Sequence, residues 1–123
     1  MIKIKHGVKM HGLKTSMIKP ISFLDKIFMI LDVDCVITSA IRPLKGNEKS
    51  LHPHGHAIDI RTRDLSFLQK GALLVLLIEY LGNDYDVVEY KTHFHIEYQR
   101  HLDDNRGFNF IKYFGQDKFD EVN

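Results

Sequence analysis

The 123-residue sequence has little cysteine, little excess charge and no long apolar run, and each shortage excludes a class of protein. Cys35 is the one cysteine, so an internal disulfide is impossible, and the following Val36 and Ile37 indicate a small core residue. A lone thiol also fits a reducing compartment. The formal net charge is +1 and no run of five basic residues occurs, which argues against a nucleic-acid partner. The continuous apolar stretch at residues 72–78 is seven residues long, whereas a membrane-spanning helix needs about twenty.

The rest of the composition is typical of one globular domain. A chain of 123 residues with 44% apolar content can bury a real core, so we expect a single domain spanning 1–123. Residues 1–5 alternate in polarity and lack the apolar core and cleavage site of a secretory signal, so we expect no signal peptide. No internal repeat or low-complexity linker interrupts the sequence.

Hydrophobic periodicity predicts two helices and a set of short strands. From Ser16, which can cap a helix, apolar residues recur at three- and four-residue steps until near Asp32. A second helix is predicted over 65–81, with Asp64 as its N-cap and Gly82 at its C-terminus. We therefore expect an α+β fold, in which a small, mostly antiparallel sheet packs against two helices. Alternating or β-branched segments predict the strands, at residues 1–5, 35–39, 57–61, 85–90 and 93–98.

Two histidine-rich segments carry the chemistry of this sequence. Residues 50–59 contain three histidines and an aspartate, and residues 89–95 contain a glutamate and two further histidines. Zn²⁺ prefers imidazole and carboxylate ligands, and three protein ligands suffice in a catalytic site because one position stays open for water. Alternation along residues 57–61 points Asp59 away from its two neighbouring isoleucines and out of the core. We therefore predict that the two segments fold around one Zn²⁺ ion.

The first segment leaves its histidine ligand open. His54 and His56 alternate with His52, so either could bind the ion in its place beside Asp59. His52-x-His54 followed by Asp59 also matches half of a cupin metal motif. Cupins are all-β proteins, however, and the helix predicted over 65–81 argues against that fold.

The second segment leaves a similar choice. Alternation places His93, His95 and Glu97 on one face of a strand, so that one of the two histidines can supply the third ligand. Glu97 would then either orient the ligand imidazole or serve as an alternative acid.

Three ordered motifs resemble one superfamily. Ser50, His52, Gly55, Ala57 and Asp59 fill a Ser-x-His-x-x-Gly-x-Ala-x-Asp pattern that resembles the signature of the D-Ala-D-Ala metallopeptidases. That superfamily includes lysostaphin-type peptidases and the hedgehog signalling domain. Upstream, the segment at 37–42 is similar to the family's strand that ends in Ser-Gly-Tyr-Arg. Downstream, the segment at 89–95 resembles the hedgehog-type arrangement of Glu followed by His-x-His. The resemblance therefore extends over about residues 35–98.

The resemblance implies a ligand set and a catalytic acid. His52, Asp59 and His95 would bind Zn²⁺, and Glu89 would accept a proton from the attacking water. Many bacterial carboxypeptidases instead place the acid three residues before the last ligand histidine. That position is Thr92 here, so the acid must be Glu89 or the site lacks one.

The resemblance also implies how the substrate is held. His93 would stabilise the oxyanion, and Arg42 would hold a carboxylate or carbonyl oxygen of the substrate, with Ser50 as a second substrate-binding residue. A donor at a developing oxyanion is typically worth a few kcal/mol, and arginine suits bidentate recognition of a carboxylate.

The implied function is that of a zinc-dependent peptidase that hydrolyses peptidoglycan stem peptides, at the D-Ala-D-Ala terminus or the L-Ala-D-Glu bond. A small chain without an export signal fits a phage endolysin that stays in the host cytoplasm before its release to the cell wall. The alternative is a hedgehog-like zinc-binding module that binds a partner without catalysis, and a metal nuclease is a weaker third hypothesis because no basic groove is evident. The tail at 102–123 would pack on the sheet or line a substrate groove through its aromatic residues, which are Phe108, Phe110, Tyr113, Phe114 and Phe119.

Overall fold

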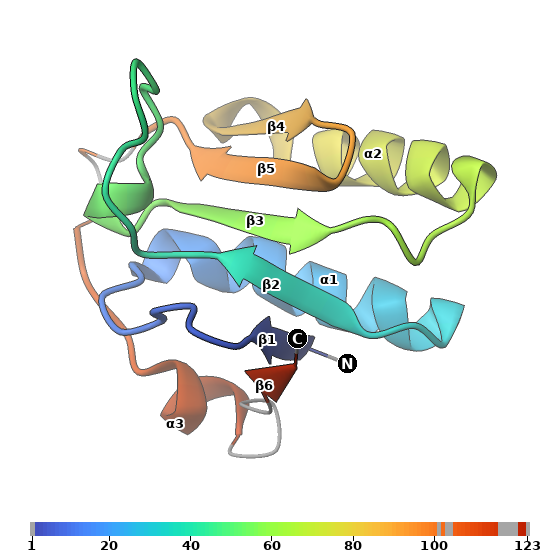
Figure 1. The fold of residues 1–123 in the computed structure, drawn as a ribbon, viewed down its shortest axis with the longest axis horizontal. Helices are drawn as coiled ribbons and strands as arrows, with labels where there is room; N and C mark the ends of the chain where they lie inside the picture. The colour runs from blue at the N-terminus through green and yellow to red at the C-terminus, as the bar shows by residue number, and fades with distance from the viewer. Residues whose placement is uncertain (1, 101, 103–104, 116–120, 123) are drawn as a thin grey trace.

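A mixed β-sheet with helices on one face forms the framework of the computed structural model, which describes residues 2–100, 102, 105–115 and 121–122 (Figure 1). Its six strands follow the order β4-β5-β3-β2-β1-β6. β1 pairs in parallel with β2 and β6, while the other three pairings are antiparallel. The expected α+β class is therefore confirmed, and the sheet is mixed, with antiparallel pairing around β3 and β5.

The five predicted strands all form, and a sixth short strand that the sequence pattern did not predict adds to the edge of the sheet. β6 pairs with β1 through Ile4 and Lys5. The strands are β1 (Ile2–Lys5), β2 (Cys35–Ser39), β3 (Ala57–Arg61), β4 (Tyr85–Glu89), β5 (His93–Tyr98) and β6 (Glu121–Val122).

The two predicted helices also form. α1 (Ile18–Leu31) follows a short 3₁₀ turn, η1 (Thr15–Met17), and α2 (Phe67–Leu81) ends at Gly82, whose φ of 75° suits a glycine. A short helix, α3 (Phe110–Phe114), follows the sheet strands. None of the helices in the described part of the chain is both long and apolar enough to span a membrane.

The predicted N-cap of α2 is wrong. Ser66, not Asp64, caps this helix, because the Ser66 hydroxyl accepts a hydrogen bond from the Gln69 backbone N–H at 3.1 Å. The Gln69 side chain in turn accepts from the Ser66 N–H at 2.9 Å. This reciprocal capping box satisfies two backbone donors at once, which Asp64 could not do from two residues further back.

The hydrophobic core lies between the sheet and the two long helices, which sit behind the sheet in Figure 1. Cys35 is fully buried there, and burial raises the pKa of its thiol, so it packs as the expected inert core residue. The helices contribute Ile21, Leu24, Phe28, Leu73 and Leu77, and the neighbouring strands β3 and β5 contribute Ile58, Ile60, Phe94 and Ile96.

The opposite face of β3 and β5 is not covered by α1 or α2. In the antiparallel register, Asp59 lies directly across from His95, one residue away from the buried pairs Ile58–Ile96 and Ile60–Phe94. The segment between β2 and β3 rises beside this face at one end (Figure 1). Strand alternation thus gives the same two strands a core face and an open face.

Three of the described aromatic residues of the tail pack on the core, whereas Tyr113 is exposed. Phe110 is buried, and Phe108 and Phe114 pack against the core residues as one aromatic group, with ring centroids 5.0 to 6.2 Å apart. None of the described tail residues lines the cavity on the open face. Phe119 lies outside the described residues.

Candidate metal centre

Three side chains from separate elements converge on the open face of the sheet. His52 begins a 3₁₀ turn, η2 (His52–His54), just before β3, while Asp59 and His95 lie mid-strand on β3 and β5. One ligand atom from each residue lies within 4.8 Å of the other two. The predicted meeting of two distant segments is confirmed, and the cluster could hold a metal ion.

His52 has a buried nitrogen that is aimed at this cluster. Its imidazole is fully buried, and Nδ1 donates to the carbonyl oxygen of Ala40 at 2.7 Å, so Nε2 carries the lone pair. Nε2 lies 3.3 Å from Oδ1 of Asp59 but has no hydrogen-bond partner among the described residues. A buried acceptor left without a partner costs free energy, and a cation between these two atoms would remove that cost.

Glu97 fixes the orientation of His95. The His95 ring has Nδ1 2.8 Å from Oδ1 of Asp59 and Nε2 3.1 Å from Oε1 of Glu97. The same Glu97 oxygen accepts from the backbone N–H of Leu51 at 2.8 Å. Carboxylates often hold a metal-binding imidazole in this way. When Nε2 donates to Glu97, Nδ1 presents its lone pair to the cluster, so the geometry favours the orienting role for Glu97.

The electrostatics of the cluster call for a positive charge. Burial alone would lower the pKa of His95, but the Asp59 and Glu97 carboxylates raise it to about 9. Burial would likewise raise the pKa of Asp59, yet the neighbouring imidazoles of His52 and His95 hold it below its usual range. At neutral pH His95 is therefore protonated and donates to both carboxylates, and a metal ion at Nδ1 would replace its proton. A set of two nitrogens and one oxygen fits Zn²⁺, and also other divalent ions.

The other histidines of the first segment do not join the cluster. His54 is exposed, and the buried His56 has Nδ1 2.7 Å from the hydroxyl of Ser16. Within the described chain, the group that could hold a metal contains only the three residues above. Of the three histidines that the sequence left open as ligands, His52 is the one that belongs to the cluster.

Gly55 and Ser50 shape the turn that carries His52. Gly55 has a φ of 79°, and an added Cβ there would collide with the carbonyl of Gly12. The Ser50 hydroxyl accepts from the His52 backbone N–H at 3.3 Å and also lines the cavity. Both residues of the motif thus have a local structural role in the turn.

His93 lies on the same face as the cluster, as its alternation predicts. Its Nε2 is 3.9 Å from Oδ2 of Asp59, and its Nδ1 is 3.0 Å from the Thr92 hydroxyl. The ring stacks on Tyr90 with centroids 4.8 Å apart and 17° between planes. His93 is therefore held at the edge of the cluster with Nε2 toward it.

Glu89 lies on the other face, and the expectation that the hairpin brings it over His95 is wrong. In the β4–β5 register Glu89 pairs with Phe94, whereas Val88 pairs with His95. Directly paired residues share a face, so Glu89 points to the helix side. There its carboxylate lies 3.9 Å from Nζ of Lys70 on α2.

Arg42 is engaged by a carboxylate of the chain itself. Its guanidinium donates to both oxygens of Glu48, at 2.6 and 2.8 Å, and to the Ser39 hydroxyl at 2.8 Å. It also donates to the Pro43 carbonyl at 3.0 Å. The hydrogen bond from Arg42 is the main cause that lowers the pKa of Glu48 to about 2. Sequence reasoning missed this pair, because no periodic pattern links a loop carboxylate to an arginine six residues away.

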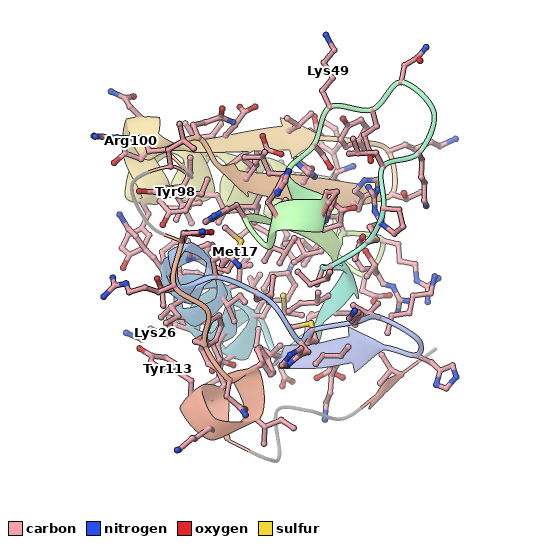
Figure 2. All side chains as sticks on the ribbon, turned by 90° about the vertical axis from the view of Figure 1, so that its left-hand side faces the viewer. Met17, Lys26, Lys49, Tyr98, Arg100 and Tyr113 are labelled. Atoms are coloured by element: carbon pink, nitrogen blue, oxygen red, sulfur yellow. The ribbon has the colours of Figure 1, made fainter. Side chains whose placement is uncertain are left out.

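A cavity of about 840 Å³ lies on the open face, and Asp59 and His95 of the cluster line it. Arg61 lines it, and extending the alternation of Asp59 by two residues could have identified this side chain from the sequence. Lys49 also lines it and extends outward from its loop (Figure 2). The cationic side chains of the wall are Lys5, Arg42, Lys45, Lys49, Arg61 and Arg63, and the carboxylates are Glu48, Asp59, Asp86 and Glu97.

Comparison with the models of known protein families, with curated proteins and with solved structures finds no match for this chain. The resemblance of three sequence motifs to the D-Ala-D-Ala metallopeptidases therefore stays a prediction. The proposed function therefore rests on the cluster and the cavity beside it.

Proposed function

We propose that this chain is a zinc-dependent peptidase that hydrolyses peptidoglycan stem peptides. The observation that carries the proposal is the buried Nε2 of His52, which has no hydrogen-bond partner among the described residues and lies beside Asp59 and His95, the two residues of the cluster that line the cavity. Buried polar groups in folded proteins are nearly always hydrogen-bonded, so an acceptor nitrogen such as His52 Nε2 beside a carboxylate indicates a binding site rather than a purely structural cluster. A cavity of about 840 Å³ is within the size range of ligand sites.

In this proposal His52 Nε2, Asp59 Oδ1 and His95 Nδ1 hold the ion, and Glu97 keeps the His95 ring in place. A divalent ion in such a site acts as a Lewis acid toward a carbonyl group and favours the ionisation of water. Because Glu97 already accepts hydrogen bonds from His95 and Leu51, its role is to hold the His95 imidazole in position to bind the ion.

We assign proton transfer and oxyanion stabilisation to His93 in place of Glu89. His93 Nε2 faces the cluster, and the stacking on Tyr90 together with the Thr92 contact limits the motion of the ring. An imidazole can donate to a developing oxyanion and can also carry a proton to a leaving amine near neutral pH. Loss of such a group typically costs about a hundredfold or more in rate.

The test is hydrolysis of purified muropeptides by the zinc-loaded chain, with a chelator and with added zinc as the two controls. Turnover should stop on chelation and return with zinc, and His52→Ala should abolish it. His11→Ala removes an exposed histidine of the 10–14 loop and should leave turnover unchanged. Hydrolysis that persists after chelation or in the His52→Ala variant would contradict the proposal.

The placement of Glu89 gives specific support to the second candidate, a zinc-binding module without catalysis. With that carboxylate on the helix face, the acid that the resemblance assigns is not at the cluster. This candidate predicts bound zinc and a loss of stability on chelation, but no turnover of any muropeptide. Zinc content and the muropeptide digest, measured on the same preparation, separate the two functions.

A further inference from the structure

The side of α2 that faces away from the sheet is apolar. The only charged residues of this helix are Lys70 and Glu79. Three leucines are buried against the core, while Leu68 and Val75 on the outer side are 81% and 55% exposed. A surface helix normally carries polar residues on its exposed side, and a helix that is apolar all round is normally buried. The outer side of α2 therefore has the composition of a covered surface.

α1 lies beside α2 in the opposite direction and extends this apolar surface. At one end, Phe23 stacks on Tyr80 with ring centroids 4.3 Å apart. Ile30 follows Phe23 by about two helical turns, so it lies on the same side of α1, and it is 79% exposed. An apolar groove of about 250 Å³ lies between the two helices, and the residues that line it include Ile27, Leu31, Leu68, Ala72 and Leu76.

The exposed apolar area is of the size that a dimer needs. Five large side chains, exposed by 43–81%, make up what we name the outer helix face, and they are Ile30, Leu68, Val75, Leu76 and Tyr80. At roughly 150–200 Å² for a large side chain, these fractions leave on the order of 500 Å² of apolar surface open. Monomeric proteins rarely expose a contiguous apolar patch larger than a few hundred Å². A homodimer interface of about 800 Å² per partner is roughly 65% apolar, so the outer helix face supplies the area that such an interface requires.

The charges beside the outer helix face are self-complementary. Lys26 extends from α1 away from the sheet (Figure 2), and Glu79 is exposed on α2. Neither side chain forms an ion pair within the described chain. Lys19 lies over the Tyr80 ring, with Nζ 5.1 Å from its centroid. A surface with a cation on one helix and an anion on the other can pair with a second copy of itself, whereas a strongly basic surface would favour an anionic partner.

We propose that the outer helix face is the interface of a symmetric homodimer, so that its partner is a second copy of this chain. In a two-fold interface each contact between two different residues forms twice. With the axis parallel to the helices, α1 of each copy lies over α2 of the other. The cavity on the open face of the sheet stays accessible in both copies, so this inference does not depend on the proposed peptidase function.

The arrangement of the two helices decides which charges meet across the axis. α1 and α2 run antiparallel, with Phe23 beside Tyr80. Lys26, three residues after Phe23, therefore lies level with the position three residues before Tyr80, which is two residues from Glu79. Two residues correspond to about 3 Å along a helix axis, a distance that a lysine side chain spans. Lys26 of each copy thus pairs with Glu79 of the other.

The experiment measures the mass of the full chain by sedimentation equilibrium, over roughly 1 μM to 1 mM. The weight-average mass should rise from 14.4 kDa toward twice that value, with half-association at about 1–100 μM for an interface of this size. Leu68→Asp places a charge within the interface and should raise the dissociation constant at least about tenfold. Leu44→Asp, the same change at an exposed leucine of the loop at 43–48, should leave it unchanged. Far-UV circular dichroism checks that both variants keep their fold, as expected for exposed positions.

A charge exchange tests the pairing across the axis. Lys26→Glu and Glu79→Lys each place two like charges face to face at both symmetric positions, so each should raise the dissociation constant roughly tenfold. The double variant reverses both signs and should return to within about twofold of the wild-type chain. Lys112→Glu, which changes an exposed lysine on α3, is the matched control and should change association little.

Three results would each overturn the homodimer. The wild-type chain could stay at 14.4 kDa over the whole concentration range, the dimer could persist in Leu68→Asp, or the double charge variant could associate as weakly as the two single variants. Binding of a monomeric chain to phosphatidylcholine vesicles, lost in Leu68→Asp, would assign the outer helix face to a lipid surface and contradict the proposal as well.

Discussion

The two faces of β3 and β5 differ in what burial does for them. On the helix side, Ile58, Ile60 and Phe94 are fully buried and apolar, so each contributes stability in proportion to the area removed from water. On the open side, Asp59 and His95 are also largely buried, but they form an ionised pair, and Nε2 of the neighbouring His52 has no hydrogen-bond partner among the described residues. Burial stabilises the first face outright, whereas on the second face it costs free energy that a bound cation would offset. Substitutions on the helix side should therefore change the stability of the fold, and substitutions on the open side should change metal binding, although the residues are neighbours on the same strand.

The largest effect is expected on the helix side. Phe94→Ala should lower the free energy of unfolding by about 3–5 kcal/mol, because it leaves a cavity among fully buried neighbours. The loss should be the same with and without zinc, measured by chemical denaturation under both conditions. Phe94→Leu serves as a milder variant if the alanine form does not fold. A loss below about 1 kcal/mol would show that this face is not packed as described.

The two faces also differ from each other in the sequence pattern, which predicts part of the site correctly. A period of two along β3 and β5 fixes which residues share a face, so the core residues of these strands and the place of Asp59 on the open face followed from the pattern. The choice of His52 and His95 among the histidines followed only from the resemblance. The same rule failed for Glu89, because the register of a hairpin depends on its turn and a shift of one residue moves a side chain to the other face.

Contacts outside regular elements were beyond prediction for a different reason. The Arg42–Glu48 pair depends on how an irregular loop folds back, which no periodicity encodes. The cap of α2 was ambiguous because both Asp64 and Ser66 are good capping residues, and the reciprocal bond with Gln69 decided between them. The pairing of β6 with β1 joins residues more than a hundred positions apart.

An intermediate effect is expected on the open side. Glu97→Gln should weaken zinc binding about 10–100-fold, since it removes the charged partner of the His95 imidazole. Competition with a chromophoric chelator measures the affinity, and the stability of the metal-free chain should change far less than in Phe94→Ala.

Asp86→Asn is the matched control for Glu97→Gln. Asp86 lies directly across from Glu97 in the β4–β5 register and lines the same cavity. Its variant removes the same charge from the same face without touching His95. Equal losses of affinity in the two variants would mean that general electrostatics, rather than the orientation of His95, explains the effect.

The smallest effect is expected from Glu89→Gln, which changes a carboxylate on the helix side of β4. Its side chain is about half exposed, and the 3.9 Å contact with Lys70 is a surface ion pair of the kind worth about 0–1 kcal/mol. Zinc affinity and turnover should therefore match the wild-type chain, whereas His93→Ala on the open side should lower kcat about a hundredfold or more. If Glu89→Gln instead abolished turnover while zinc binding stayed intact, β4 would have to pair with β5 one residue out of the described register. Glu89 would then face the cluster, and the separation of the sheet into a stabilising face and a chemical face would fail at this strand.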